Sequence, residues 1–358
     1  MASIVKQANG RWRARYRDNS GTEHSQRFDR KSDAQRWIDA QSAALVRGDY
    51  VDPATARTTV AAWCDTWLDA YSGNQPSTVR QARVHVKHIV EEFGAVRLVD
   101  VKPSAIRAWC ARLKRRGLAD STVYAIHARL SQILADAVHD GIIARNPCSR
   151  RTSPGAGKQR PYVVSTAQVW ALHDAVPGYV RPAVLLGAFA GLRVAEVCGL
   201  RVEDVDFMRG LVSPRMQYPD RPLKTDASAA PVPIPIELAA VLGDWTGERG
   251  WIVEDLLGRQ VGPWAIQRAV RDAREAAALP EEFRFHDLRH YFASLLIAAG
   301  ADVKVVQARL RHSNATTTLN TYAHLWPDTE ESTRAAVAEV LAARADSVEP
   351  RAAGLRPI

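Results

Sequence analysis

The residues of this chain best suited to catalysis are two arginines, two histidines and a tyrosine in its C-terminal half. The set consists of Arg193, His286, Arg289, His312 and Tyr322. A phosphodiester anion repels nucleophiles, so a site that cleaves one needs fixed positive charge beside its non-bridging oxygens. Two guanidinium groups supply that charge through paired hydrogen bonds. The set therefore predicts a site in which the phenol of Tyr322 attacks a phosphodiester.

Helical spacing predicts which of these side chains lie together. Arg193 and Glu196 are three residues apart after Gly191, and His286 and Arg289 are also three apart. Residues at this spacing share a helix face, and a helix N-terminus favours anions. We therefore expect Arg193 and Arg289 to bind the phosphate while Glu196 orients Arg193. We expect His286 to donate a hydrogen bond to the phosphate or to move a proton there.

Each residue also has an ordinary interpretation when it is taken alone. An Arg193–Glu196 pair on a surface helix contributes little to stability, and a tyrosine such as Tyr322 is often half-buried. A histidine at the start of a helix is usually a cap or a packed side chain. We interpret His290 in that way and expect it to face elsewhere. The joint occurrence of the other residues in one chain favours catalysis.

Three short segments carry a resemblance to a known family. They read Ala-Gly-Leu-Arg-Val-Ala-Glu at 190–196, His-Asp-Leu-Arg-His at 286–290 and Thr-Thr-Thr-Leu-Asn-Thr-Tyr at 316–322. In order, spacing and residue types they resemble the tyrosine recombinases, the family of phage integrases and related site-specific recombinases. The resemblance covers roughly the whole chain and is strongest from about Val163 to Trp326. It implies a 3′-phosphotyrosyl intermediate at Tyr322 and strand exchange through a Holliday junction, which integrates or excises a phage or mobile element.

The resemblance adds a general acid and one departure from the family pattern. Lys224 lies between candidate strands at 211–215 and 229–234, and by resemblance it protonates the leaving 5′-oxygen. Neighbouring arginines would make that ammonium give up its proton more readily. Arg311 stands where the family usually has a glycine that ends a helix in the left-handed conformation. Either the turn before His312 differs here or the arginine tolerates strain.

An N-terminal module is predicted for residues 1–55. The segment from Arg11 to Arg17 alternates strictly between arginine and Trp12, Ala14 or Tyr16, so a strand there gathers the arginines on one face. A second strand at 22–28 and a helix from about Ser32 complete the module. The arginine face predicts contact with DNA phosphates, and a solvated strand edge is the alternative. The candidate contacts are Arg11, Arg13, Arg15 and Arg17.

A helical domain is predicted for residues 56–148. Its four helices are expected at 59–71, 77–93, 104–116 and 121–139, each beginning near a serine or threonine cap. Basic side chains on the second of them are candidate DNA contacts, with a solvated rim as the alternative. These residues are Arg80, Arg83 and Lys87. By resemblance this is the core-binding domain.

The fold class is therefore multidomain and mainly α with small β elements. A linker at 149–162, rich in Gly, Pro, Ser and basic residues, leads to an α+β catalytic domain at 163–346. That domain ends in a tail helix starting near Pro327, which packs either on its own domain or on a neighbouring subunit. Residues 347–358 are expected to be disordered.

Composition agrees with a polyanionic partner. Lys and Arg total 48 against 39 Asp and Glu, giving a formal net charge of +9. The four cysteines are far apart, which favours buried thiols over a metal site or disulfides. No apolar run is long enough to span a membrane, and the N-terminal residues do not show the apolar h-region of a signal peptide. We expect a cytoplasmic protein of a bacterial host, without metal or cofactor and independent of ATP.

The expected partners follow from the resemblance. They are double-stranded attachment sites of core and arm types, further copies of the chain in a homotetramer on synapsed DNA, and candidate accessory factors that bend DNA or direct excision. The alternatives are a chromosome-dimer resolving or conjugative-transposon recombinase, a DNA-binding regulator without catalysis, and a type IB topoisomerase. The N-terminal module argues against the dimer-resolving type, and the complete residue set argues against the regulator. Strand exchange between two duplexes separates a recombinase from a topoisomerase.

Overall fold

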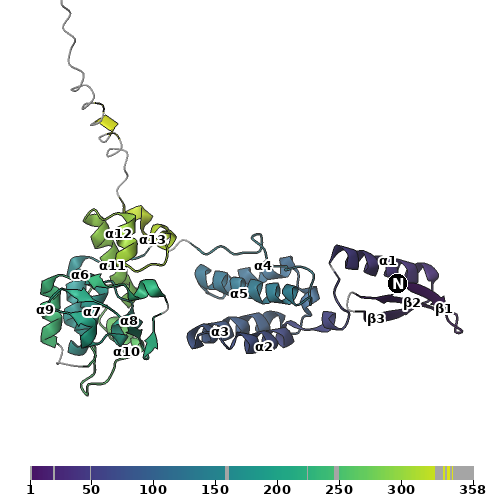
Figure 1. Cartoon of the computed structure of the whole chain (residues 1–358), viewed down its shortest axis with the longest axis horizontal. Helices are drawn as coiled ribbons and strands as arrows, with labels where there is room; N and C mark the ends of the chain where they lie inside the picture. The colour runs from purple at the N-terminus through teal and green to yellow at the C-terminus, as the bar shows by residue number, and fades with distance from the viewer. Residues whose placement is uncertain are drawn as a thin grey trace, which may run out of the picture. The chain divides into compact units, whose positions relative to one another are not determined.

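The computed structural model describes residues 2–18, 21–48, 50–157, 161–223, 225–245 and 250–326, with a few isolated positions beyond (Figure 1). The chain divides into two compact units, Met1–Lys158 and Gln159–Ile358. Lys224, most of the predicted tail helix and residues 347–358 lie outside the described residues. The predicted fold class, mainly α with small sheets, is confirmed. The finer division into domains stays a prediction.

The N-terminal part of the first unit is a three-stranded antiparallel sheet covered by one helix. Strands β1 (Ser3–Lys6), β2 (Trp12–Arg17) and β3 (Glu23–Phe28) pair in that order, and α1 (Lys31–Arg47) packs against β2. Ala14 and Tyr16 are buried, as the alternating pattern predicts. Gly48 ends α1 with a φ of 73°, a left-handed cap that glycine adopts without strain. Strand β1 was not predicted from the sequence.

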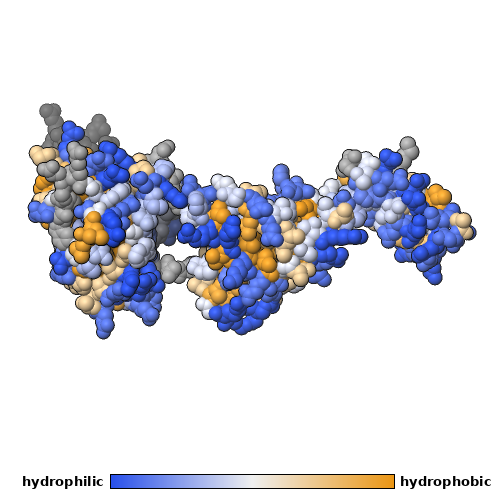
Figure 2. All heavy atoms as spheres, turned by 90° about the horizontal axis from the view of Figure 1, so that it is seen from below, coloured by the Kyte–Doolittle hydropathy of each residue, from blue (hydrophilic) through white to orange (hydrophobic). Residues whose placement is uncertain are grey.

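Four helices follow in the first unit. They are α2 (Val60–Tyr71), α3 (Pro76–Phe93), α4 (Pro103–Arg115) and α5 (Asp120–His139). Thr59 caps α2 as predicted, but α3 and α4 begin one residue before the predicted serines because proline fits the first helical position. Tryptophan and aliphatic side chains from all four helices form one core. Figure 2 shows a mainly hydrophilic face on which hydrophobic residues gather most clearly over this bundle.

The second unit surrounds a buried helix. Helix α7 (Arg181–Phe189) is buried at nearly every position and packs against α11 (Phe285–Ala298). The remaining helices of this unit are α6 (Thr166–Ala175), α8 (Val194–Gly199), α9 (Ile236–Trp245), α10 (Pro263–Asp272), α12 (Val303–Arg309) and α13 (Ala315–Tyr322). Short 3₁₀ turns occur in both units. In the first unit they lie at Thr55–Arg57 and Leu98–Asp100, and in the second at Gly178–Val180, Val202–Asp204, Asp226–Ala229 and Ala323–Leu325. An all-round apolar helix such as α7 is stable only inside a core.

Two small sheets lie beside these helices. Strands β4 (Val205–Asp206), β5 (Leu211–Val212) and β8 (Val232–Pro233) form one antiparallel sheet. Strands β6 (Met216–Gln217) and β7 (Arg221–Pro222) form a hairpin in the connection from β5 to β8. The antiparallel pairing of β5 with β8 confirms that position 224 lies within a connection between paired strands. That connection also holds the 3₁₀ turn Asp226–Ala229.

A second, smaller core holds the C-terminal helices together. It contains Phe292 and Ile297 from α11, Val306 from α12, and Tyr322 from α13. Gly191, which precedes α8, packs so closely on Phe292 that a side chain at 191 would collide with the ring, and its φ is 61°. The backbone before α8 is thereby held against α11. All four cysteines are buried and free, as predicted. None of the described helices is long and apolar enough to cross a lipid bilayer.

Candidate active site

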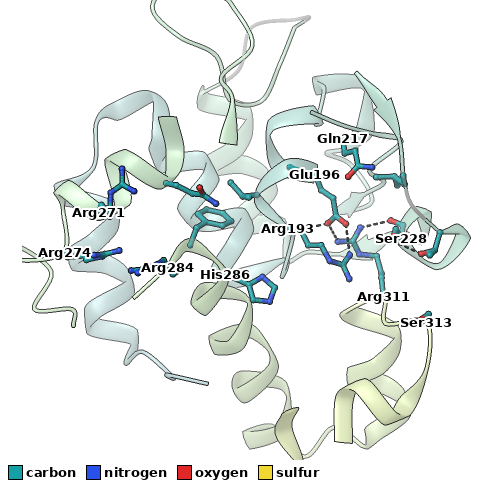
Figure 3. Close-up of a pocket in the computed structure, with 16 residues that line it drawn as sticks. Arg193, Glu196, Gln217, Ser228, Arg271, Arg274, Arg284, His286, Arg311 and Ser313 are labelled. Atoms are coloured by element: carbon teal, nitrogen blue, oxygen red, sulfur yellow. Dashed lines mark hydrogen bonds and ion pairs between the residues drawn. The ribbon is translucent and has the colours of Figure 1, made fainter. Parts of the chain in front are cut away.

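A basic cavity of about 760 Å³ opens on the second unit (Figure 3). Five arginines line it, from the residues in or beside α8, α10, α11 and α12: Arg193, Arg271, Arg274, Arg284 and Arg311. Glu196 alone is acidic among the described lining residues, so the cavity carries excess positive charge. In the view of Figure 3, His286 lies between the Arg193–Arg311 end and the end with the other three arginines. The cavity suits an anionic ligand.

Glu196 holds two of these arginines. Its carboxylate accepts hydrogen bonds from Arg193 Nη1 at 2.8 Å, from the backbone N of Arg193 at 2.9 Å and from Arg311 Nη2 at 2.5 Å. Burial opposes its ionisation, but Arg311 and then Arg193 more than offset burial, so the pKa of Glu196 is lowered. The predicted role of Glu196, which is to orient Arg193, would use these hydrogen bonds. Arg311 is an additional partner of the carboxylate.

Arg311 adopts the left-handed conformation that the sequence left open. Its φ is 54° and its side chain is 2 % exposed. Besides Glu196, it donates from Nη1 to the carbonyl oxygen of Ser228 at 2.8 Å. The turn before His312 is therefore the one glycine would make, and the arginine tolerates it.

Arg289 is buried under the backbone that surrounds the site. Its guanidinium donates to the carbonyl oxygens of Gly191 and Leu310, and the residue is 1 % exposed. It thus joins the segment before α8 to the end of α12. Burial and then Arg193 lower the pKa of Arg289 to about 9, which still leaves the group charged at neutral pH. It is not among the residues that line the cavity.

Three imidazoles that are uncharged at neutral pH lie among these cations, those of His286, His290 and His312. His286 is exposed in the cavity, yet the surrounding protein and then Arg289 and Arg193 lower its pKa to about 4. Burial and then Arg289 lower the pKa of His312 to about 4, and its Nδ1 is 2.9 Å from the Thr318 hydroxyl. At neutral pH each ring can donate one hydrogen bond and accept another.

His290 lies against Tyr322, which corrects our expectation that it faces elsewhere. Its Nδ1 is 2.7 Å from the Tyr322 hydroxyl, and its ring centroid is 4.9 Å from that of His286. Burial and then His286 lower the pKa of His290 to about 4. With its proton on Nε2, the neutral ring accepts the hydrogen bond of the phenol. The spacing of four between His286 and His290, which places them on one helix face, was the sequence signal that His290 lies at the site.

Tyr322 is buried in the small core formed by the C-terminal helices. It is 1 % exposed, and burial raises the pKa of its phenol to about 12. Asn314 caps α13 by accepting a hydrogen bond from the backbone N of Thr317. The cap fixes where α13 begins and hence where its last residue, Tyr322, lies. Tyr322 does not line the cavity.

The structure brings most of the predicted catalytic residues into one region and adds others. Arg193, Glu196 and His286 line the cavity, while Arg289, His312 and Tyr322 lie around it through the contacts above. Lys224 is outside the described residues, but its neighbours Leu223 and Thr225 line the cavity. The sequence reasoning missed the contacts of His290 and Arg311 and the three arginines Arg271, Arg274 and Arg284.

The candidate DNA-contact residues of the first unit lie on its surface. Arg11 pairs with Asp29 at 2.8 Å, and Arg15 and Arg17 approach Glu23 at 3.6 and 3.9 Å. Arg13 lies opposite Arg27 in the sheet register. On β2 the arginines alternate with the buried side chains, so the arginines face away from α1. On α3, the exposed residues include Arg80, Arg83 and Lys87.

Comparison with known proteins agrees with this arrangement. The model of the phage integrase family matches residues 166–328, and that of the phage integrase N-terminal domain matches residues 3–47. The putative prophage phiRv2 integrase of Mycobacterium tuberculosis is 26 % identical over 87 % of this chain and 88 % of its own. Tyrosine recombinase XerC of Chromohalobacter salexigens is 28 % identical over 71 % of this chain and 88 % of its own.

Solved structures share the fold. The Tn1549 transposon integrase in complex with transposon right end DNA superposes with a TM-score of 0.66 at 21 % identity, covering 80 % of this chain and 100 % of that one. A lambda integrase tetramer bound to a Holliday junction gives a TM-score of 0.58 at 22 % identity, covering 87 % and 96 %. With its order of motifs, its two matching family models and relatives along most of its length, the chain belongs to the phage integrase family of tyrosine recombinases.

Proposed function

We propose that this chain is a site-specific DNA recombinase that integrates or excises a phage or mobile element, with Tyr322 as its nucleophile. The observation that carries the proposal is the cavity lined by five arginines and one acid, close to a tyrosine bonded to a neutral histidine. Fixed cations in such a cavity stabilise the charge that develops when a phosphodiester is attacked.

In the proposed reaction, the Tyr322 oxygen forms a bond to phosphorus while the bond to the 5′-oxygen breaks. Arg193 and Arg289 bind the non-bridging oxygens, assisted by hydrogen bonds from His286 and His312. The phenol proton passes to a neutral imidazole, and Lys224 gives a proton to the leaving 5′-oxygen. The phosphotyrosyl bond keeps the energy needed for a 5′-hydroxyl of the partner duplex to reverse it.

The other basic residues are proposed to hold the DNA. Arg271, Arg274 and Arg284 extend the cavity's positive charge and are available to further phosphates of the cleaved strand. The exposed basic residues of α3 would contact core sites, and the arginine face of the N-terminal sheet would contact separate arm sites. The matching N-terminal family model supports this division. Such a reaction would act on the DNA of a bacterial host, in its cytoplasm, and in a tetramer at the synapsed sites.

Chromosome-dimer resolution is the second candidate. Relatives named tyrosine recombinase XerC are 28 % identical to this chain. The match of residues 3–47 to an integrase N-terminal domain favours integration. Recombination that depends on arm sites outside the core would decide for integration, whereas efficient recombination between bare core sites would decide for resolution.

The variant Tyr322→Phe tests the proposed nucleophile. It loses one hydroxyl, so we expect it to bind core-site DNA like the parent protein and to form no covalent complex. The measurement is a denaturing gel of protein incubated with a nicked suicide substrate, which traps the phosphotyrosyl adduct. An adduct formed by the variant would remove Tyr322 from the reaction.

A further inference from the structure

Arg311 has a backbone conformation that glycine usually adopts. Its φ of 54° lies in the left-handed region, where a side chain is strained and glycine is not. The side chain is nevertheless buried, at 2 % exposure, and is bonded on two sides. The contacts of the guanidinium must therefore offset both the strain and the loss of hydration.

Those contacts join three segments that hold proposed catalytic residues. Arg311 Nη2 bonds Glu196, which in turn accepts two hydrogen bonds from Arg193. Arg311 Nη1 bonds the carbonyl of Ser228, in the 3₁₀ turn that begins two residues after position 224. Arg311 itself precedes His312 in the chain. One buried side chain thus links the Arg193 end of the cavity to the segment after Lys224.

The charges explain why an arginine suits this place. A buried carboxylate paired with Arg193 alone would direct its whole charge at that guanidinium, which must also bind the substrate phosphate. A second cation on the opposite carboxylate oxygen shares that charge and leaves Arg193 able to bind an anion. Lysine carries the same charge but lacks the planar fork that reaches a carboxylate and a carbonyl at once.

We propose that Arg311 is a positioning residue, which holds Arg193 through Glu196 and holds the turn after Lys224 through Ser228. This inference rests on the proposed function, since it concerns the same phosphoryl transfer. Removal of a residue that orients a direct ligand typically lowers activity by about 10- to 100-fold, and we expect a loss of that size here.

The test compares Arg311→Gly with Arg311→Lys and with Arg309→Ala as a matched control. Glycine fits the backbone, so the fold should persist, and Arg309 supplies the same charge nearby without lining the cavity. Single-turnover cleavage of saturating suicide substrate is measured together with thermal unfolding and DNA affinity. We expect Arg311→Gly to lose about 10- to 100-fold in cleavage with parental DNA affinity, and with an unfolded fraction at the assay temperature too small to explain that loss. Arg311→Lys should fall between, and Arg309→Ala should match the parent.

Two further readouts separate positioning from a purely structural role. Guanidinium ion at millimolar concentration should restore part of the cleavage of Arg311→Gly and leave Arg309→Ala unchanged. A substrate with sulfur at the 5′-bridging position needs no acid, so it should also narrow the gap between Arg311→Gly and the parent.

The inference is overturned if Arg311→Gly cleaves like the parent, or if its loss only follows the unfolded fraction and neither guanidinium nor sulfur narrows it. If Arg311→Gly does not fold, Arg311→Lys carries the test, and parental cleavage by that variant overturns the inference. The parent protein reports separately on the proposed function, because failure of that function would leave the parent without an adduct at Tyr322.

Discussion

The two sides of the site differ in how they are exposed. On the side proposed to bind phosphate, Arg193 and His286 line an open cavity, and Arg193 is bonded to Glu196, which is bonded in turn to Arg311. On the side of the proposed nucleophile, Tyr322 is 1 % exposed in a small hydrophobic core, bonded to His290. The charges are therefore already arranged for an anion, while the phenol must gain access to the cavity before it can react.

The difference in exposure separates the binding of DNA from the chemical step. Preorganised charge stabilises a transition state without further rearrangement, so the phosphate side is ready when DNA binds. Burial raises the pKa of the Tyr322 phenol to about 12, so the buried phenol would be a poor nucleophile. A shift of α13 toward the cavity would couple DNA binding to activation of the phenol.

Removing either of the two arginines proposed to bind the phosphate gives the largest expected effects. Arg193→Ala and Arg289→Ala should each lower cleavage by two to three orders of magnitude, since loss of one preorganised donor costs about 3–4 kcal/mol in the transition state. Only Arg289→Ala should also lower thermal stability, because it leaves the buried carbonyls of Gly191 and Leu310 without a partner. Single-turnover cleavage and thermal unfolding measure both. Near-parental cleavage by either variant would exclude that arginine from the site.

The leaving-group side is tested by Lys224→Ala. We expect a loss of about 100-fold or more, the usual contribution of a general acid, on an ordinary substrate. A thiolate leaves without protonation, so a substrate with sulfur at the 5′-bridging position should restore cleavage to the variant and help the parent little. If sulfur gives the variant no relative advantage, another residue must donate the proton.

The arginine face of the N-terminal sheet extends the comparison to a region without predicted catalytic residues. The quadruple change of Arg11, Arg13, Arg15 and Arg17 to alanine should abolish arm-site binding and leave core-site cleavage intact, as should deletion of residues 1–55. If all four contact phosphates, the log–log salt dependence of arm binding should flatten by roughly 0.9 per lost contact. Trp12 and Tyr16 remain to hold the fold. Unchanged affinity and slope would make this face a solvated one.

A further expected effect is on stability at acid pH rather than on cleavage. The pKa values of His286, His290 and His312 are lowered to about 4, below the ordinary value near 6.5. The unfolded chain therefore binds protons more readily, and stability present above about pH 6.5 should fall as the pH drops toward 4. His290→Gln can still bond Tyr322 but cannot be protonated, so its thermal unfolding should depend less on pH. An identical pH dependence in parent and variant would contradict this.

Local patterns predicted much of the fold. Thr59 caps a helix where the sequence places it, and the alternation at Trp12–Arg17 gives the buried face of β2. Strand β1 escaped prediction because a four-residue edge strand carries little pattern.

The site was predictable where residues act through spacing along one helix. Arg193 with Glu196 is the example, because residues three apart meet within one turn. The bonds from Arg311 to Glu196 and Ser228 span 115 and 83 residues, and the bond from His290 to Tyr322 spans 32. Such contacts depend on how separate helices pack, which no local pattern in a single sequence specifies.

The most direct test of the account is to find which residue becomes bonded to DNA. The parent protein is trapped on a nicked suicide substrate, digested, and analysed by mass spectrometry for a peptide that carries nucleotide. We predict that the nucleotide is attached through its 3′-phosphate to Tyr322. An adduct on another of the nine tyrosines, or on a residue of another type, would contradict the assignment of the nucleophile.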